Sequence, residues 1–198
     1  MNQDLVDEIN YLIDLLTKSG FFSTEEILEI VEEQFIEYDL DFSSFNVSLN
    51  NFNNKNFSKL EKTFNLLAEK SIIGVHNCGY DFEEGVDDVY ELYVHLINNK
   101  CSVRGFCFYT FEDVENAIEN NVLKITFGDF QRNKDEALEI GKAVYQELSA
   151  VGFDLKWKES VNDPIEIMNF DWDKKFDESK EYEIEGAYAL YTGVIDEK

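Results

Sequence analysis

The stretch from Arg104 to Gly128 constrains the fold more than any other part of the sequence. Before Thr110 the side chains alternate with the period of two that is typical of a β-strand. Thr110 and Asp113 then stand three residues apart, which is the spacing of a capping box at the start of a helix. A second alternating run covers Val122 to Phe127. The stretch therefore predicts a strand, a helix and a strand joined by very short turns, and it contains no catalytic motif.

The flanking patterns predict an α+β fold, with an antiparallel or mixed sheet and packed helices. The pairs Ser23–Glu26 and Ser58–Glu61 have capping-box spacing, and Asn133 is placed to begin a long helix. Alternation at Phe45, Val47 and Leu49 predicts a short strand. With that strand, the order up to Gly128 is the βαββαβ order of a ferredoxin-like core with an inserted helix, extended by a helix and two further strands.

Three segments follow from these patterns. Residues 1–40 are predicted to form a helical hairpin, which is either a cap on the fold or an interaction arm. Residues 41–178 are predicted to form the α+β core domain. Residues 179–198 form an acidic C-terminal tail, in which Tyr182 to Ile195 is compatible with an edge strand.

The charge of the chain limits its partners. The 198 residues include 42 acidic and 17 basic side chains, a formal net charge of −25. Such a field repels nucleic acids and anionic membranes and attracts basic proteins. Since the N-terminus is acidic, no apolar run has the length of a membrane span and the three cysteines show no pairing pattern, we expect a cytoplasmic protein.

Between about Phe57 and Asp173 the chain resembles an uncharacterised family of bacterial cytoplasmic proteins, a domain of unknown function. The resemblance rests on the following residues: Leu60, Phe64, Leu67, Ile73-Gly74, Cys78-Gly79, Arg104-Gly105-Phe106, Phe108-Tyr109, Asp113, Leu123, Phe127-Gly128, Ile140-Gly141, Gly152-Phe153, Trp157 and Asp171-Trp172. The family favours Gln where this chain has Glu112, and it often has more cysteines near Cys78. The resemblance implies a fold and a cytoplasmic setting, and it implies no activity.

Two groups of residues have the chemistry of metal ligands but not the spacing. His76 and Cys78 lie far along the chain from His95 and Cys101, whereas zinc ligands usually come in tightly spaced pairs. The acidic run that begins at Asp81 has Leu92 at the twelfth position, where a calcium loop needs a glutamate. We therefore expect no metal site, no cofactor and no catalytic residue.

Six residues are the candidate binding residues. Arg104 is one of few basic side chains, and we expect it either to pair with a buried acid such as Asp113 or Asp171 or to contact a ligand. Aromatic side chains are expected to line a cleft with it or to pack in the core. The six are Arg104, Tyr109, Asp113, Trp157, Asp171 and Trp172.

Three functions stay open on the sequence alone. The first is a non-catalytic acidic protein that binds a basic protein, as an inhibitor or immunity protein does. The second is a small-molecule binder or enzyme, in which Arg104, Tyr109, Asp113 and Trp172 converge in one pocket. The third is a structural or housekeeping domain. The sequence does not determine the oligomeric state.

Overall fold

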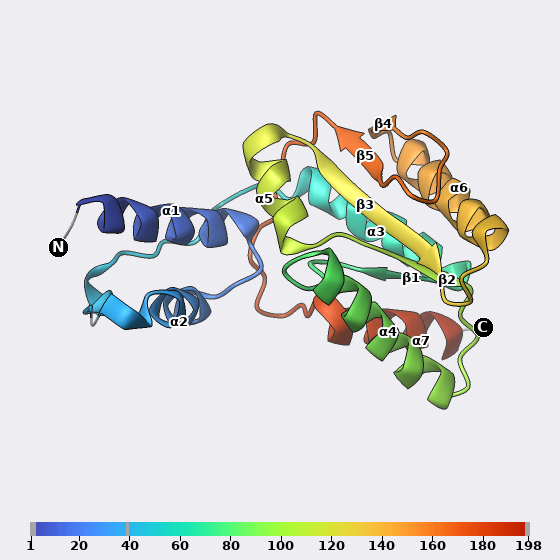
Figure 1. The fold of residues 1–198 in the computed structure, drawn as a ribbon, viewed down its shortest axis with the longest axis horizontal. Helices are drawn as coiled ribbons and strands as arrows, with labels where there is room; N and C mark the ends of the chain where they lie inside the picture. The colour runs from blue at the N-terminus through green and yellow to red at the C-terminus, as the bar shows by residue number, and fades with distance from the viewer. Residues whose placement is uncertain (1–2, 39, 197–198) are drawn as a thin grey trace.

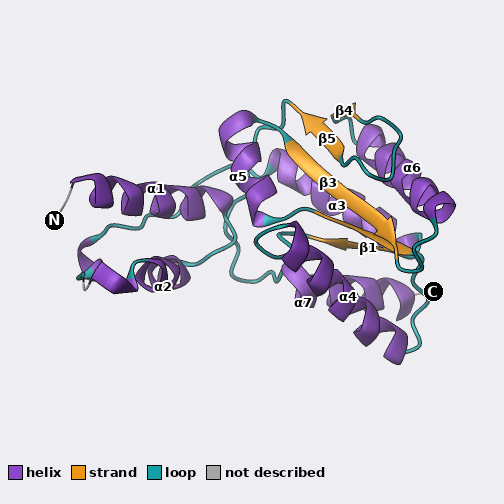
Figure 2. Cartoon of the chain, viewed as in Figure 1, coloured by secondary structure: helices purple, strands orange, loops and turns teal. Residues whose placement is uncertain are grey.

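The computed structural model describes residues 3–38 and 40–196. The described part of the chain has an α+β fold, with seven α-helices and a mixed sheet of five strands (Figures 1 and 2). The helices are α1 (Gln3–Ser19), α2 (Thr24–Gln34), α3 (Lys55–Glu69), α4 (Phe82–Asn98), α5 (Phe111–Asn120), α6 (Lys134–Ala150) and α7 (Glu183–Asp196). The strands are β1 (Ile72–Val75), β2 (Gly105–Phe108), β3 (Leu123–Asp129), β4 (Asp154–Lys156) and β5 (Ile165–Met168). Two short 3₁₀ turns, Ile36–Tyr38 and Phe42–Ser44, follow α2.

The strand order in the sheet is β1-β2-β3-β5-β4. β1 and β2 are parallel and are joined through α4, whereas the other neighbouring pairs are antiparallel. Val75 stands opposite Phe108, so β1 and β2 have their carboxyl ends side by side, at the same end of the sheet. In doubly wound α/β sheets, ligands bind outside the carboxyl ends of parallel strands.

Helices cover the two faces of the sheet unequally. One face packs on α3 and α6 through a continuous apolar cluster that reaches all five strands, with Leu123, Ile125 and Ile167 at its centre. The opposite face packs on α4 and α7 mainly through Ile73 and Val75 of β1 and through the aromatic residues of β2. β3 alternates buried and half-buried residues, and Lys124 and Thr126 lie on the less covered face.

The N-terminal hairpin α1–α2 extends from the end of the core at which α5 begins (Figure 1). Its own apolar cluster includes Ile9, Leu16, Ile27 and Val31 and also takes in Phe111 of α5. The hairpin therefore packs on the core through apolar contacts. No helix in the described part of the chain has both the length and the hydropathy that a bilayer span requires.

Local sequence explains most helix starts. Ser23 with Glu26 and Thr110 with Asp113 both form reciprocal capping boxes, as predicted. Asn133 caps α6, and its side chain accepts bonds from two backbone N–H groups. The strand–helix–strand unit between Arg104 and Gly128 is confirmed as β2, α5 and β3.

Three predictions about local structure are wrong. Phe45, Val47 and Leu49 form no strand, because Phe45 and Val47 pack against the hairpin cluster and no strand lies beside them. The ferredoxin-like order that depended on this strand is therefore absent among the described residues. Ser58 begins no helix, because α3 begins three residues earlier, at Lys55.

The third error concerns the tail, where the predicted edge strand is the helix α7. Its buried residues Ala187 and Tyr191 lie four positions apart, which places both on the side that packs against the core. The division of the chain into three domain ranges stays a prediction, and residues 1, 2, 39, 197 and 198 of those ranges lie outside the described part.

Candidate functional site

The carboxyl ends of β1 and β2 continue into a buried polar pair. His76 follows Val75 and Tyr109 follows Phe108, so the parallel register places the two side chains next to each other. His76 Nδ1 and the Tyr109 hydroxyl share a hydrogen bond of 2.9 Å. Burial lowers the pKa of His76 to about 3, so its imidazole is neutral at pH 7. This pair fixes the geometry of the strand ends.

The chain after His76 turns through Asn77, Cys78, Gly79 and Tyr80 before α4 begins. The Cys78 thiol is buried and donates to the carbonyl of Gly85, and burial raises its pKa, so the thiol is protonated and bonded within the core. Within residues 3–38 and 40–196, no group of three or more potential metal ligands comes together.

Asn77 is the unusual residue of the turn. It has a positive φ of 49° and is 5% exposed. Its Nδ2 donates to Glu183 of α7 at 2.8 Å, whereas its Oδ1 has no hydrogen-bond partner among the described residues. An unsatisfied buried acceptor costs about 1–3 kcal/mol, so its presence at the end of a strand suggests a place where a ligand donates a hydrogen bond.

A cavity of about 700 Å³ lies where the hairpin covers this edge of the sheet, and we call it the hairpin cleft. Its walls come from the hairpin, from the turn after β1, from α4 and from the starts of α5 and α7. The lining residues are Tyr11, Leu12, Leu15, Leu16, Phe22, Ile30, Gln34, Asn77, Gly79, Tyr80, Asp88, Phe111, Glu115 and Glu183. The cleft thus combines an apolar floor with a small number of polar groups, which is the usual make-up of a binding pocket.

The polar groups of the hairpin cleft are one-sided in charge. Among the residues that the structure describes, three carboxylates line it and no lysine or arginine does. Burial raises the pKa of Asp88 and of Glu183, and the neighbouring acids raise both further. A positive charge bound in the cleft would stabilise the ionised forms of these carboxylates.

A short anchor segment, residues 171–176, holds the hairpin against the core. Trp172 Nε1 donates to the Ser19 carbonyl at 3.1 Å, and Lys174 Nζ donates to the Gly20 carbonyl at 2.5 Å. The Lys174 side chain is 1% exposed, and its ammonium lies 4.1–5.1 Å from the ring centroids of Phe21, Phe57 and Tyr182. At the far end of the cleft, the Tyr11 hydroxyl bonds to Glu115 and Glu119 of α5.

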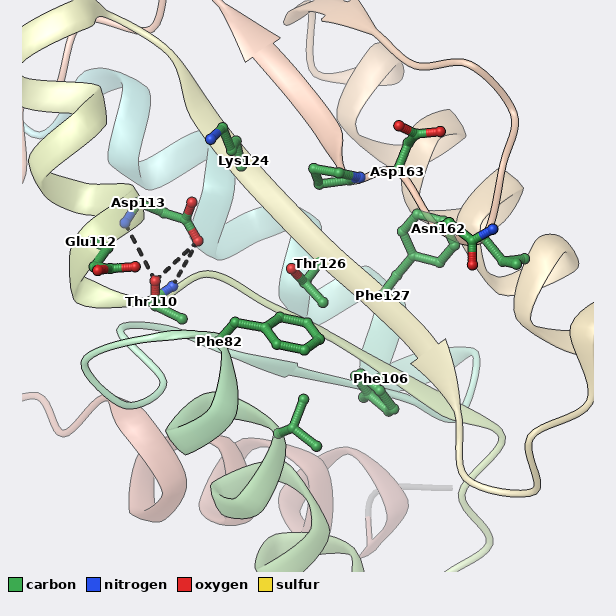
Figure 3. Close-up of a pocket in the computed structure, with 13 residues that line it drawn as sticks. Phe82, Phe106, Thr110, Glu112, Asp113, Lys124, Thr126, Phe127, Asn162 and Asp163 are labelled. Atoms are coloured by element: carbon green, nitrogen blue, oxygen red, sulfur yellow. Dashed lines mark hydrogen bonds between the residues drawn. The ribbon is translucent and has the colours of Figure 1, made fainter.

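A second cavity, of about 570 Å³, lies beside β3, and we call it the sheet groove (Figure 3). Side chains of α4, the start of α5, β3 and the turn before β5 surround it. They are Phe82, Val86, Phe106, Thr110, Glu112, Asp113, Lys124, Thr126, Phe127, Val161, Asn162, Asp163 and Pro164. Unlike the hairpin cleft, the groove contains charges of both signs.

The six candidate residues do not meet in one cavity. Tyr109 and Trp172 are buried, and their ring centroids lie 6.0 Å apart. Asp171 lies in a separate hollow, which Trp172 also lines. Asp113 lies in the sheet groove. Trp157 packs edge-to-face on Phe127, in the core.

Arg104 lies apart from the other five. Its side chain is 44% exposed, and its Nε lies 2.7 Å from a carboxylate oxygen of Glu136. The sequence had suggested Asp113 or Asp171 as its partner instead. An exposed pair of this kind contributes at most about 1 kcal/mol. The proposed convergence of Arg104, Tyr109, Asp113 and Trp172 in one pocket is therefore wrong.

The sequence did not single out Asn77, Glu183 or Tyr11, which line the hairpin cleft. Asp88 belongs to the acidic run that begins at Asp81, which was considered only as a calcium loop. The parallel pairing of β1 and β2 was the available indication, because it brings the residues after each strand to one edge. Glu183 could not be found in this way, since it lies 106 residues from Asn77.

Comparison with known proteins identifies the core. The model of a family described as a domain of unknown function, DUF6891, matches residues 52–176, and no curated protein and no solved structure matches the chain. The matched range contains every residue that lines the sheet groove, whereas the hairpin cleft takes half of its lining from residues 11–34 and one residue from α7. Since the match covers more than half of the chain and includes all five strands, the protein belongs to the DUF6891 family.

Proposed function

We propose that the protein is a non-catalytic cytoplasmic binding protein whose hairpin cleft receives a basic and partly apolar segment of another protein. The proposal rests on one observation, the charge of the cleft. Asp88, Glu115 and Glu183 line it together with the unsatisfied Asn77 Oδ1, and none of its lining residues in the described part of the chain is basic. Carboxylates held where burial raises their pKa gain most from a bound cation.

The apolar floor limits what this cation is attached to. Leu12, Leu15 and Phe22 of the hairpin line the cleft together with Tyr80 and Phe111 of the core. The ring of Tyr80 is 55% exposed and stacks on that of Phe111 with centroids 6.2 Å apart, and an exposed tyrosine ring can bind a guanidinium or ammonium group. A segment with arginine or lysine next to leucine-like side chains fits this lining better than a free metal ion, which prefers oxygen ligands only.

The charge of the whole chain supports the same kind of partner. A net charge of −25 accelerates the approach of a basic protein and opposes that of nucleic acid. The cytoplasm fits the three free thiols, Cys78, Cys101 and Cys107. An inhibitor or immunity protein is one role that such binding serves.

The test compares the native protein with two variants of equal charge. The cleft variant contains Asp88→Asn, Glu115→Gln and Glu183→Gln, and the control variant contains Glu29→Gln, Glu32→Gln and Glu33→Gln on the exposed side of α2. Each tagged protein is incubated with native lysate, washed with rising salt and analysed by mass spectrometry.

We expect a basic protein that the native protein and the control variant retain at low salt and that the cleft variant loses. Equal retention by both variants would show that the whole acidic surface, and not the hairpin cleft, is responsible. No retained basic protein with any of the three would contradict the proposed function.

A further inference from the structure

We propose that the sheet groove is a second, independent binding site, for a small zwitterion with an aromatic group such as an aromatic α-amino acid. The groove lies beside the part of the sheet where the cover by α4 and α7 ends. Thr126 of β3 and Phe82 of α4 point toward the same space, and Asp113 and Lys124 lie at one end of it (Figure 3). Its volume of about 570 Å³ is within the range of small-molecule pockets.

The basic group is Lys124, which is half-buried and forms no ion pair or hydrogen bond with any residue of the described part. Its cross-strand neighbour in β5 is Glu166, but the Glu166 carboxylate bonds to Lys156 of β4 at 2.8 Å. In a chain with 42 acidic and 17 basic residues, an unpaired lysine in a cavity is unexpected. An anionic group of a ligand would satisfy it.

The acidic group is Asp113, at the start of α5. Its Oδ2 accepts the N–H and the hydroxyl of Thr110, and no described residue bonds to its Oδ1. Burial raises the pKa of this carboxyl, whereas the two hydrogen bonds from Thr110 and, to a smaller extent, the charge of Lys124 lower it, although Asp113 and Lys124 form no ion pair. A ligand that carries both charges can bind Asp113 through its ammonium group and Lys124 through its carboxylate.

The apolar contact is Phe82, which is 59% exposed in the first turn of α4. Its ring lies 6.4 Å from that of Phe108, and Val86 and Phe106 continue the apolar side of the groove. An aromatic ring between Phe82 and the β3 backbone would bury this exposed surface. Two opposite charges and one aromatic surface together define the ligand class.

The experiment compares phenylalanine with two analogues, each of which lacks one of its two charges. Phenylalanine has both charges, phenethylamine lacks the carboxylate and 3-phenylpropionate lacks the ammonium group. Binding to the full-length protein is measured by isothermal titration, and again with Lys124→Met and with Lys62→Met, which removes an exposed lysine of α3 outside the groove. Unfolding curves confirm that each variant is folded.

We expect phenylalanine to bind the native protein at least about tenfold more tightly than either analogue, which corresponds to about 1.4 kcal/mol. Lys124→Met should remove the preference for phenylalanine over phenethylamine, and Lys62→Met should not. The proposal is overturned if phenylalanine does not bind, if phenethylamine binds equally well, or if Lys124→Met has no effect. Because Lys124 is outside the hairpin cleft, these results are independent of the basic-partner test.

Discussion

The hairpin cleft lies beyond the carboxyl ends of β1 and β2, the sheet groove lies beside β3, and the chain builds the two cavities differently. The groove consists of residues 82–164 and is contained in the family domain. The cleft needs α1, α2 and α7, all of which lie outside the matched range 52–176. Their charges differ in the same way, since the cleft is only acidic and the groove is mixed. A property of the groove is therefore a candidate for the family, whereas a property of the cleft belongs to this chain's additions.

The largest expected effect comes from separating the hairpin from the core with Gly20→Ala. Gly20 has a φ of +71°, and a Cβ there would lie 2.3 Å from the Lys174 carbonyl oxygen. The left-handed conformation and the clash together should cost about 2–5 kcal/mol. Partner binding in the cleft should be lost, and phenylalanine binding in the groove should persist.

Gly152→Ala is the matched control for this change. Gly152 has a similar φ of +86°, but nothing lies within 4 Å of the added Cβ. We expect a cost of about 1–2 kcal/mol in urea unfolding and normal binding at both sites. Equal effects of the two substitutions would show that the Lys174 contact does not hold the hairpin.

The second-largest effect is expected from removing the charge of Asp173, which should lower the stability of the core. The Asp173 carboxylate is buried and accepts the backbone N–H groups of Asn56 and Phe57, so it caps α3 from the anchor segment. Asp173→Asn should lower the free energy of unfolding by about 1–2 kcal/mol, because the amide is a weaker acceptor and lacks the charge that the helix N-terminus favours. Asp171→Asn, at an exposed neighbour, should change stability by less than about 0.5 kcal/mol in the same urea titration.

A third prediction concerns how the contribution of Lys174, in the anchor segment, to the free energy of unfolding depends on pH. Burial lowers the pKa of Lys174 to about 7, against the attraction of the three rings and of Glu61 and Asp177. Between pH 7 and the ordinary lysine pKa, the unfolded chain therefore binds one proton more than the folded protein, and stability from this group rises with pH. In Lys174→Met this contribution is absent.

Urea titrations from pH 7 to pH 9 should show the stability of the native protein rising relative to Lys174→Met by about 1 kcal/mol per pH unit. A difference that stays constant with pH would mean that Lys174 remains an ammonium ion in the fold, held by the aromatic rings.

The smallest effect is expected at the outer end of the cleft. Tyr11→Phe removes the hydroxyl that donates to Glu115 and Glu119 while leaving the ring in place. Because these bonds are exposed, the free energy of unfolding from thermal unfolding curves should change by less than about 1 kcal/mol. A large destabilisation would indicate that this contact, and not the anchor segment, holds the hairpin.

The sequence predicted the elements whose causes are local. The capping pairs Ser23–Glu26 and Thr110–Asp113 and the alternation in β3 depend on residues close in the chain, and the structure confirms them. The cap of α3 depends on Asp173, which is 116 residues from Phe57, so Ser58 and Glu61 were mistaken for the cap. In α7, glycines and β-branched residues concealed a helical spacing that tertiary packing on β1 and α4 stabilises.

The two cavities were harder to predict for the same reason. The hairpin cleft joins Asn77 to Glu183 and Tyr11 to Glu115, and each pair is brought together only by the fold. Asp113 was one of the candidate residues, and the sequence suggested Arg104 as its partner, whereas Lys124 lines the groove with it and Arg104 pairs with Glu136. The neighbour of Asp113 in the groove was therefore not predicted.

The measurement that tests the central claim most directly is the affinity of a defined basic peptide. A short labelled peptide of arginine and leucine is compared with the same peptide in which citrulline, a neutral isostere, replaces arginine. Fluorescence anisotropy gives both affinities for the native protein, the cleft variant and the α2 control variant. The difference between the two peptides isolates the contribution of positive charge.

We predict that the native protein and the control variant prefer the arginine peptide by at least about tenfold, and that the cleft variant loses this preference while still binding both peptides weakly through the apolar floor. If the cleft variant keeps the preference, or if the control variant loses it equally, the hairpin cleft is not the site at which this protein recognises positive charge.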